Sequence, residues 1–405
     1  MKDPNQKKSR YVNLCFQVHQ PRRLRQFQFS EIGSDQGIFN DKLNAAIMKR
    51  IADECYLPAN RLLLKLIETY PHIKISFSIS GSVLDQMIEY APQVVTSFQA
   101  LADTGAVEFL SETYFNSLSY FISKEEFKEQ VIRHSQKLNQ LFGQRPGVFR
   151  NTDLIYNDEI GTVVSELGLM GIYVEGTPRL LDTKSPNKLY LHPDKKLVLC
   201  PRDFAISDFI GFGYAKDPSV TPDNVISRIR NVASGQFVSL GISYETFGEH
   251  KKFSEGIFDF LEGLMTRLAE SADIKLTTLE NACPSLDKSS VVASKEFSSW
   301  ADQEKDLSAW LGNELQRVAF ESLKKMYKQV KGTGSLKLMN IYRALQTSDH
   351  FYYMSTKGMA CQKVHDVVSH YDSPYQAFRN YMNILSDFEL SVKRYRAKRL
   401  ELTLN

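Results

Sequence analysis

Residues 11–21 read YVNLCFQVHQP, and their pattern decides the fold class. Apolar side chains fall at every second position of this stretch: Val12, Leu14, Phe16 and Val18. Residues 75–80 (ISFSIS) repeat the alternation, with isoleucine and phenylalanine facing one way and serine the other. Period-two alternation is typical of β-strands, so we predict a strand at each place. Serines on one strand face fit a crowded barrel interior or a solvated sheet face.

Five further stretches have strand character, and helical patterns separate several of them. The predicted strands are 107–112, 148–151, 171–175, 197–203 and 237–245, and the predicted helices are 41–70, 83–104, 124–142 and 157–167. Strands that alternate with helices pair in parallel through right-handed crossovers. A doubly wound nucleotide-binding sheet is disfavoured, because no GxGxxG follows the first strand and no GxxxxGK[ST] occurs. We therefore predict an α/β fold with a seven-stranded parallel (β/α)7 barrel.

The last third of the chain is helical in pattern. Residues 284–296 are rich in Ser, Lys and Asp, which predicts a linker. Residues 301–331 have apolar side chains at helical spacing, and a second helix is expected over 373–399, with Ser373 and Pro374 at its start. We predict two domains: a barrel carrying the cleft at 10–285 and a helical bundle packed on it at 286–405.

Composition excludes several classes of partner. The 405 residues include 50 Lys+Arg and 47 Asp+Glu, so a net charge of +3 gives no bulk attraction for nucleic acid or membrane surfaces. No apolar run approaches the roughly 20 residues of a membrane span, and residues 1–10 lead into no signal-peptide core. The five cysteines are scattered without a CxxC pair, which favours a reducing compartment, the cytoplasm.

In a parallel barrel the functional site lies at the carboxyl ends of the strands. The polar residues there are His19, Gln20, Ser80, Ser82, Glu112, Arg150, Asn151, Asp153, Arg202, Asp203, Ser243, Glu245, Glu249 and His250. Carboxylates that converge with a histidine and aromatic residues suit glycoside chemistry, in which two carboxyl groups flank the scissile bond. A metal-dependent deacetylase barrel would need an aspartate with two histidines about four apart, and the sequence has no such pair. We expect no metal and no other cofactor.

Several motifs in order along the chain resemble a known family. They are HQP at 19–21, ETY at 112–114, FRNTDLIY at 149–156, YETFGEH at 244–250, WAD at 300–302, WLGN at 310–313 and DHFYYM at 349–354. This set is similar to the signatures of glycoside hydrolase family 57, in its α-amylase branch, and spans roughly residues 11–388. The resemblance implies a (β/α)7 barrel followed by a helical bundle. It also implies retaining cleavage or transfer of α-glucan linkages, without a catalytic metal.

The resemblance also implies which residues contact an α-glucan or a maltooligosaccharide. These are His19, Glu112, Arg150, Asp208, Glu249, Asp349 and His350, the last two placed over the barrel mouth. Three of them have a plainer alternative: His19 as a hydrogen-bonded wall residue, Glu112 as a helix cap, and Arg150 as half of a structural ion pair. From spacing alone, Asp349 and His350 would lie in a loop. The oligomeric state is not indicated.

The chain departs from the family pattern at the catalytic positions. Asp153 stands where the family carries its glutamate nucleophile, and Ser243 stands where it carries an aspartate acid/base. The spacing of 90 residues (243 − 153) fits the family. Asn116 also replaces a usual histidine, and Phe209 replaces the second of two adjacent acids after Asp208.

These departures predict weak or lost hydrolysis. An aspartate arm is about 1.5 Å shorter than a glutamate arm, and a misplacement of about 1 Å can cost ~100-fold. An alcohol at 243 cannot supply the ~10²–10⁴-fold of general acid catalysis. Glu245 points to the same strand face as Ser243, so Glu245 or Glu249 acting as a substitute acid would make an active hydrolase or glucanotransferase. Alternatively Glu245 holds Arg150 or His250, or the whole chain is a non-catalytic docking protein.

Overall fold

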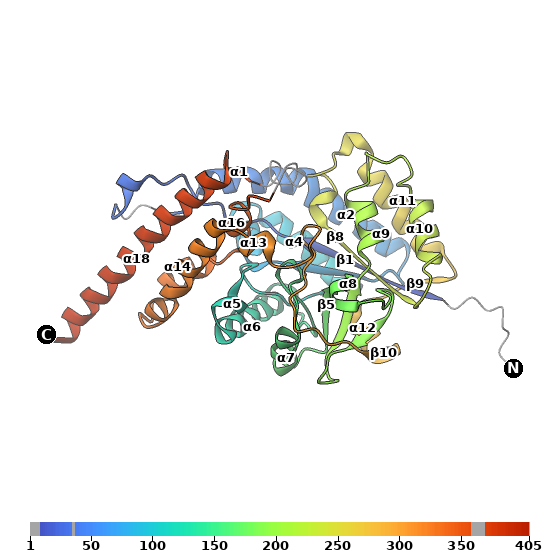
Figure 1. Ribbon diagram of the computed structural model, residues 1–405. Coiled ribbons are helices and arrows are strands. Elements are labelled where there is room, and N and C mark those ends of the chain that lie inside the picture. Colours follow the sequence, from blue (N-terminus) through green and yellow to red (C-terminus); the bar gives the residue numbers. More distant parts are fainter. Residues whose placement is uncertain (1–8, 35–36, 358–368, 405) are drawn as a thin grey trace.

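A computed structural model describes residues 9–34, 37–357 and 369–404 (Figure 1). Cys361 lies outside the described residues. All seven predicted strands are present: β1 (Arg10–Val18), β2 (Ile75–Ile79), β3 (Val107–Phe109), β4 (Val148–Arg150), β5 (Gly171–Glu175), β7 (Val198–Arg202) and β8 (Phe237–Ser243).

These seven strands form a closed parallel ring. Strand β1 pairs with β2 on one side and β8 on the other, β8 pairs with β7, β7 with β5, and β5 with β4. Strand β3 pairs with β2, and a parallel bridge between Ser111 and Phe149 joins the end of β3 to β4. The ring confirms the predicted (β/α)7 barrel.

Three short strands extend the ring at its edges. Strand β6 (Leu189–Leu191) runs antiparallel to β7, β9 (Ile274–Leu276) pairs with β1, and β10 (Lys288–Val291) pairs with β6. The linker predicted over 284–296 was therefore wrong for Lys288–Val291. Its Ser-rich composition reflects a largely exposed strand rather than a connection without structure.

Helices cover the outside of the ring. In the barrel region they are α1 (Asp41–Ile51), α2 (Leu57–Thr69), α3 (Gly81–Tyr90), α4 (Pro92–Asp103), α5 (Ser119–Ile122), α6 (Lys124–Phe142), α7 (Asp158–Glu166), α8 (Pro178–Leu181), α9 (Phe204–Gly211), α10 (Pro222–Arg230), α11 (Ile257–Glu270) and α12 (Leu279–Ser285). Short turns of helix are η1 (Phe29–Glu31), η3 (Thr152–Leu154), η4 (Tyr244–Thr246) and η5 (Phe253–Glu255). The predicted helix over 83–104 is two helices, because Pro92 disfavours helical geometry at Ala91, which has φ −150° and ψ 60°.

The predicted helix over 41–70 contains a π-helical turn, η2 (Ala52–Tyr56), between α1 and α2. Such turns occur often at functional sites because they redirect side chains. Here the turn carries Tyr56, which reaches the end of β8.

The C-terminal helices lie together on one side of the barrel (Figure 1, orange to red). They are α13 (Ser308–Leu311), α14 (Glu314–Lys331), α15 (Leu336–Ala344), α16 (Ser348–Tyr352) and α18 (Pro374–Leu404). Helix α14 begins after its cap Asn313 and not at 301 as expected. Apolar residues of both regions share one core cluster, for example Phe149 and Ile172 with Phe320 and Tyr381. In the part of the chain that the structure describes, no helix is long and apolar enough to cross a membrane.

Candidate active site

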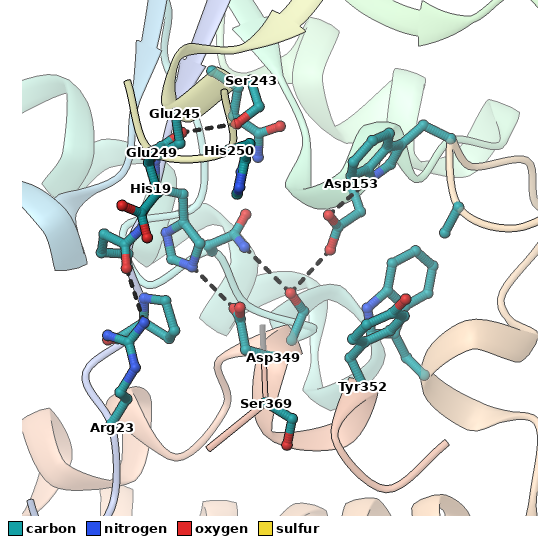
Figure 2. Close-up of a pocket in the computed structure, with 18 of the residues that line it drawn as sticks. His19, Arg23, Asp153, Ser243, Glu245, Glu249, His250, Asp349, Tyr352 and Ser369 are labelled. Atoms are coloured by element: carbon teal, nitrogen blue, oxygen red, sulfur yellow. Dashed lines mark hydrogen bonds and ion pairs between the residues drawn. The ribbon is translucent and has the colours of Figure 1, made fainter. Parts of the chain in front are cut away.

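A cavity of about 590 Å³ opens at the carboxyl ends of the barrel strands, beside the C-terminal helices. The barrel contributes His19, Asp153, Asp208, Phe212, Ser243, Glu245 and Glu249, and the C-terminal region contributes Trp300, Trp310, Ser348, Asp349 and Tyr352. Seven of the ten residues predicted for the site line this cavity (Figure 2). The other three, Glu112, Arg150 and His350, do not line it.

Three donors hold Glu245 in one wall of the cavity, and Figure 2 shows the one from Ser243. The Ser243 hydroxyl donates to its Oε2 at 2.8 Å, and the Tyr56 hydroxyl donates to its Oε1 at 2.6 Å. The backbone N–H of His19 also donates to Oε1, at 3.1 Å. The three contacts fix the position of both carboxylate oxygens. None of the three is the side chain of Arg150 or His250, which are the partners that the sequence suggested for Glu245.

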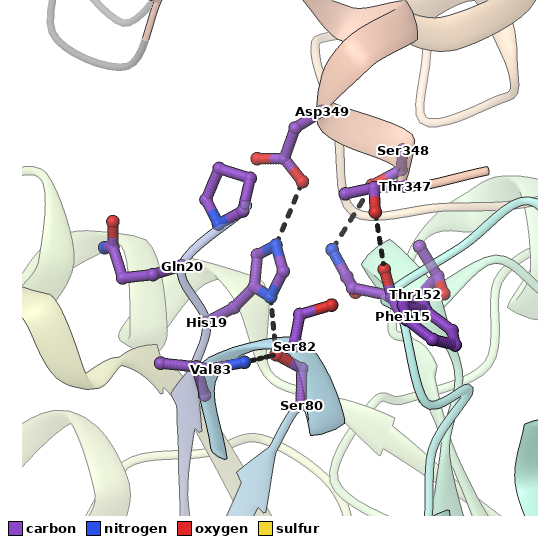
Figure 3. A network of polar contacts seen from close by, with 12 residues as sticks. His19, Gln20, Ser80, Ser82, Val83, Phe115, Thr152, Thr347, Ser348 and Asp349 are labelled. Carbon is purple, nitrogen blue, oxygen red and sulfur yellow. Dashed lines mark hydrogen bonds and ion pairs between the residues drawn. The ribbon is translucent and has the colours of Figure 1, made fainter. Parts of the chain in front are cut away.

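His19 and Asp349 form a pair between the barrel and α16 (Figure 3). His19 Nε2 lies 2.9 Å from Asp349 Oδ2, and His19 Nδ1 lies 2.6 Å from the hydroxyl of Ser80, which caps α3. Burial lowers the pKa of His19, but the Asp349 carboxylate outweighs burial and raises it overall. Burial likewise raises the pKa of Asp349, and His19 reverses this, so the net pKa is lowered. Both shifts favour the charged pair.

Asp153 has strained backbone geometry and a carboxylate that is held on both sides. Its φ is +52° and that of Leu154 is +54°, the left-handed region that non-glycine residues rarely adopt. The indole N–H of Trp300 donates to Oδ1 at 2.9 Å, and the Ser348 hydroxyl donates to Oδ2 at 2.9 Å. Burial raises the pKa of Asp153, and these two hydrogen bonds oppose the shift.

Asn116 lines the cavity and donates to the Ser348 hydroxyl at 3.2 Å. It thereby supports one of the two groups that hold Asp153. The φ of Asn116 is +46°, which asparagine tolerates better than most residues.

The two outer carboxylates are engaged in ion pairs. Arg50 contacts both oxygens of Glu249, and Lys252 lies 3.7 Å away. Burial raises the pKa of Glu249, but Arg50 outweighs it and the net pKa is lowered. Asp208 accepts a hydrogen bond from Arg202.

The three predicted residues that do not line the cavity are buried. Burial raises the pKa of Glu112 to about 7, against the hydrogen bond from Ser78 and the charge of Arg150. Arg150 donates to Gln17 at 2.7 Å, and Gln17 lines the cavity, so Arg150 supports its floor. His350 lies beside the Tyr381 ring, and burial lowers its pKa to about 4.

Sequence reasoning missed Tyr56 and Ser348 as members of the site. Tyr56 lies in an apolar helical stretch and gives no local signal, because only the π-helical turn directs it towards Glu245. Ser348 directly precedes the quoted DHFYYM motif, so its neighbourhood offered a clue. Trp300 belongs to the quoted WAD motif, but nothing in the sequence indicated that its indole N–H binds Asp153.

A parallel (β/α)7 barrel with carboxylates and tryptophans around one cavity fits glycoside chemistry, in which two carboxyl groups flank the scissile bond. The family model of glycosyl hydrolase family 57 matches residues 13–294. A Methanocaldococcus jannaschii protein, provisionally named alpha-amylase, is 38% identical over 96% of this chain and 86% of its own. The chain therefore belongs to glycosyl hydrolase family 57.

Solved structures agree on the fold. A GH57-type branching enzyme from Pyrococcus horikoshii superposes with a TM-score of 0.70 at 14% identity, covering 96% of this chain and 91% of that enzyme. A GH57 branching enzyme from Thermococcus kodakaraensis gives a TM-score of 0.69 at 12% identity, covering 93% and 88%. The 4-alpha-glucanotransferase of Thermococcus litoralis gives 0.68 at 13% identity, covering 85% of this chain and 56% of that enzyme.

Proposed function

We propose that the protein binds α-glucan or maltooligosaccharide in this cavity and that its retaining hydrolysis is weak or lost. Family membership supports the ligand class, since the relatives are an amylase, branching enzymes and a glucanotransferase. The observation that carries the loss of hydrolysis is the hydrogen bond from the Ser243 hydroxyl to Glu245. A hydroxyl stands where the family has its proton donor.

The chemistry at Asp153 supports the same conclusion. Retaining enzymes hold their two carboxyl groups about 5–5.5 Å apart, so that one attacks the sugar while the other protonates the leaving oxygen. The shorter aspartate arm withdraws the nucleophile. Trp300 and Ser348 each donate to one of its oxygens, which stabilises the charge of the carboxylate and lowers its nucleophilicity.

The alternative of an active hydrolase or glucanotransferase needs a substitute acid, and both candidates are poorly suited to that role. A general acid must carry a proton near the working pH. Glu245 accepts hydrogen bonds from three donors, and Glu249 is ion-paired with Arg50, which holds its pKa below the ordinary value. The lowered pKa of Glu249 favours its ionised form, which has no proton to give. The oxygens of Glu245 are already engaged by Ser243, Tyr56 and the backbone of His19.

Binding and turnover together test the proposal. The chain has two tryptophans, Trp300 and Trp310, and both line the cavity, so intrinsic fluorescence reports on its occupancy. We expect maltoheptaose to change the fluorescence saturably, cellooligosaccharides of equal length to have little effect, and reducing-sugar release to be weak or absent. Efficient hydrolysis would contradict the loss of activity. Absence of binding would favour a docking protein instead.

Two sequence predictions remain part of this proposal. We keep the division into a barrel at 10–285 and a helical bundle at 286–405 as a proposal. Apolar residues of both regions belong to one core cluster, so the two regions pack together. The reducing cytoplasm is the proposed location.

A further inference from the structure

Helix α9 presents an exposed aromatic ring to the cavity. Phe212, the residue that caps this helix, is 50% exposed and lines the cavity. Other large apolar side chains of α9 are covered: Ile206 and Ile210 are buried, and the guanidinium carbon of Arg228 lies 3.8 Å from the centroid of the Phe209 ring. Phe29 and Phe253 are more exposed but do not line the cavity, so what distinguishes Phe212 is that its apolar ring is offered to a ligand in the cavity.

Asp208 lies four residues before Phe212 and therefore on the same face of the helix. It also lines the cavity, and its side chain is 30% exposed. Arg202, which binds one of its oxygens, is itself fixed by Glu175 at 3.2 Å and by the carbonyl of Gly241 at 2.8 Å. The carboxylate is thus held in orientation from behind.

An apolar ring face beside an oriented carboxylate matches the two sides of a pyranose. The C–H face of a sugar ring packs on aromatic carbon, and its hydroxyl groups donate to carboxylate oxygens. We propose that Phe212 and Asp208 form a sugar subsite that binds a glucosyl unit of an α-glucan next to the Asp153–Ser243 centre. This inference rests on the proposed function, because it takes the same ligand and extends its path.

The position of helix α9 explains how one glucan molecule reaches both the Asp153–Ser243 centre and the proposed subsite. Helix α9 follows β7, the neighbour of β8 in the ring, and the Ser207 hydroxyl accepts from the backbone N–H of Gly241 at 3.1 Å. Ser243 lies two residues further along that strand. Because Phe212 and Asp208 line the same cavity as Asp153 and Ser243, a glucan bound at the centre can extend to them within that cavity.

The experiment is a fluorescence titration of the full chain with maltose, maltotriose, maltopentaose and maltoheptaose. Phe212→Ala should weaken binding of the longer ligands by about ten-fold, the size expected for losing one aromatic contact, and should leave maltose nearly unchanged. Phe212→Tyr keeps the ring and should bind as wild type does. Phe29→Ala is the matched control, because Phe29 is 80% exposed and is not among the residues that line the cavity. Asp208→Asn should also weaken the longer ligands, while thermal melting verifies that every variant is folded.

The outcomes separate the two proposals. Wild type that binds maltoheptaose, together with unchanged affinity in Phe212→Ala, overturns the subsite and leaves the proposed function standing. An equal loss for maltose and maltoheptaose also overturns it, because the ring would then belong to the centre. Wild type that binds no maltooligosaccharide overturns both.

Discussion

If the proposed function holds and the natural chain hydrolyses maltooligosaccharides weakly or not at all, replacing Ser243 by aspartate and Asp153 by glutamate should give that hydrolysis. The glutamate restores the longer arm of a nucleophile after β4. The aspartate restores a carboxyl group at the end of β8. Because the Ser243 hydroxyl lies 2.8 Å from Glu245 Oε2, a carboxyl group at 243 would be a close neighbour of the Glu245 carboxylate.

That closeness sets the size of the effect. Two charges about 4 Å apart repel by ~4 kcal/mol at an effective dielectric constant of ~20. This repulsion raises the pKa at which the pair loses its last proton well above that of an ordinary aspartate. Such a proton is available to a leaving group at neutral pH, and general acid catalysis contributes ~10²–10⁴-fold. Correct placement of the nucleophile adds ~100-fold, although the two effects will not simply multiply.

Two substrates separate the two changes. An aryl maltoside with an acidic leaving group needs no protonation, so Asp153→Glu alone should accelerate its cleavage. Maltoheptaose needs an acid, so its hydrolysis should require both substitutions. Ser243→Asn is the matched control, since it has the size of aspartate without its proton. The variant with Asp153→Glu and Ser243→Asp is compared with the control that has Asp153→Glu and Ser243→Asn. If both bind maltoheptaose and hydrolyse it equally fast, the absence of an acid at 243 is not what limits hydrolysis.

Three further substitutions test the electrostatics of the fold. Burial raises the pKa of Glu112 from 4.5 to about 7, so its ionisation destabilises the folded state increasingly as pH rises through this range. Glu112→Gln should therefore raise the melting temperature at pH 8, by an amount equivalent to roughly 3 kcal/mol of unfolding free energy, and leave it unchanged at pH 4. An equal shift of the melting temperature at both pH values would contradict this. Arg343 contacts both oxygens of the fully buried Glu126, at 2.9 and 3.0 Å, so Arg343→Met should lower the free energy of unfolding in urea by ~3–5 kcal/mol, and adding Glu126→Gln should recover part of it. The raised pKa of His19 stabilises the fold below pH 6.5, and this contribution is lost as pH rises through the raised value; Asp349→Asn should lower the pKa of His19 in an NMR titration, and an unchanged pKa would refute the pairing.

The sequence predicted the barrel well because its strands are buried on both faces or alternate cleanly. In β2 all five residues are buried, with Ser76 and Ser78 binding the carboxylates of Glu108 and Glu112 inside the barrel. The crowded interior that the serines suggested is what the structure has. Helix α6 was predicted with its bounds, since Ser123 caps its start and Gly143, with φ +68°, ends it.

The site was less predictable, because its decisive contacts join segments far apart in the chain. Tyr56 and Glu245 are 189 residues apart, and Ser348 and Asp153 are 195 apart. Period and capping rules describe neighbours within about one helical turn and carry no information about such pairs. The motif order supplied most of the cavity residues, but it could not tell that Glu112 lies beneath the cavity or that Glu249 is paired with Arg50.

Ser243 also stabilises the wall of the cavity that contains Glu245. The proposed absence of an acid at position 243 is therefore connected with the stability of the fold. The Ser243 hydroxyl donates a hydrogen bond to Glu245, whereas an ionised aspartate at 243 could not. The short distance between positions 243 and 245, which would give the aspartate a usable proton, would also make the two carboxylates repel each other once that proton is lost. Because this repulsion raises the pKa of the two carboxyl groups at 243 and 245, the Ser243→Asp variant should be tolerated at pH 5, where one of them keeps a proton. It should become progressively less stable than wild type towards pH 8, where the proton is lost. A melting temperature of Ser243→Asp that falls with pH in parallel with wild type would show that the two groups do not interact. A melting-temperature difference between Ser243→Asp and wild type that widens with pH would instead mean that an acidic side chain at position 243 is kept at the expense of stability. A protein that binds glucan without cleaving it would then be more stable with serine there.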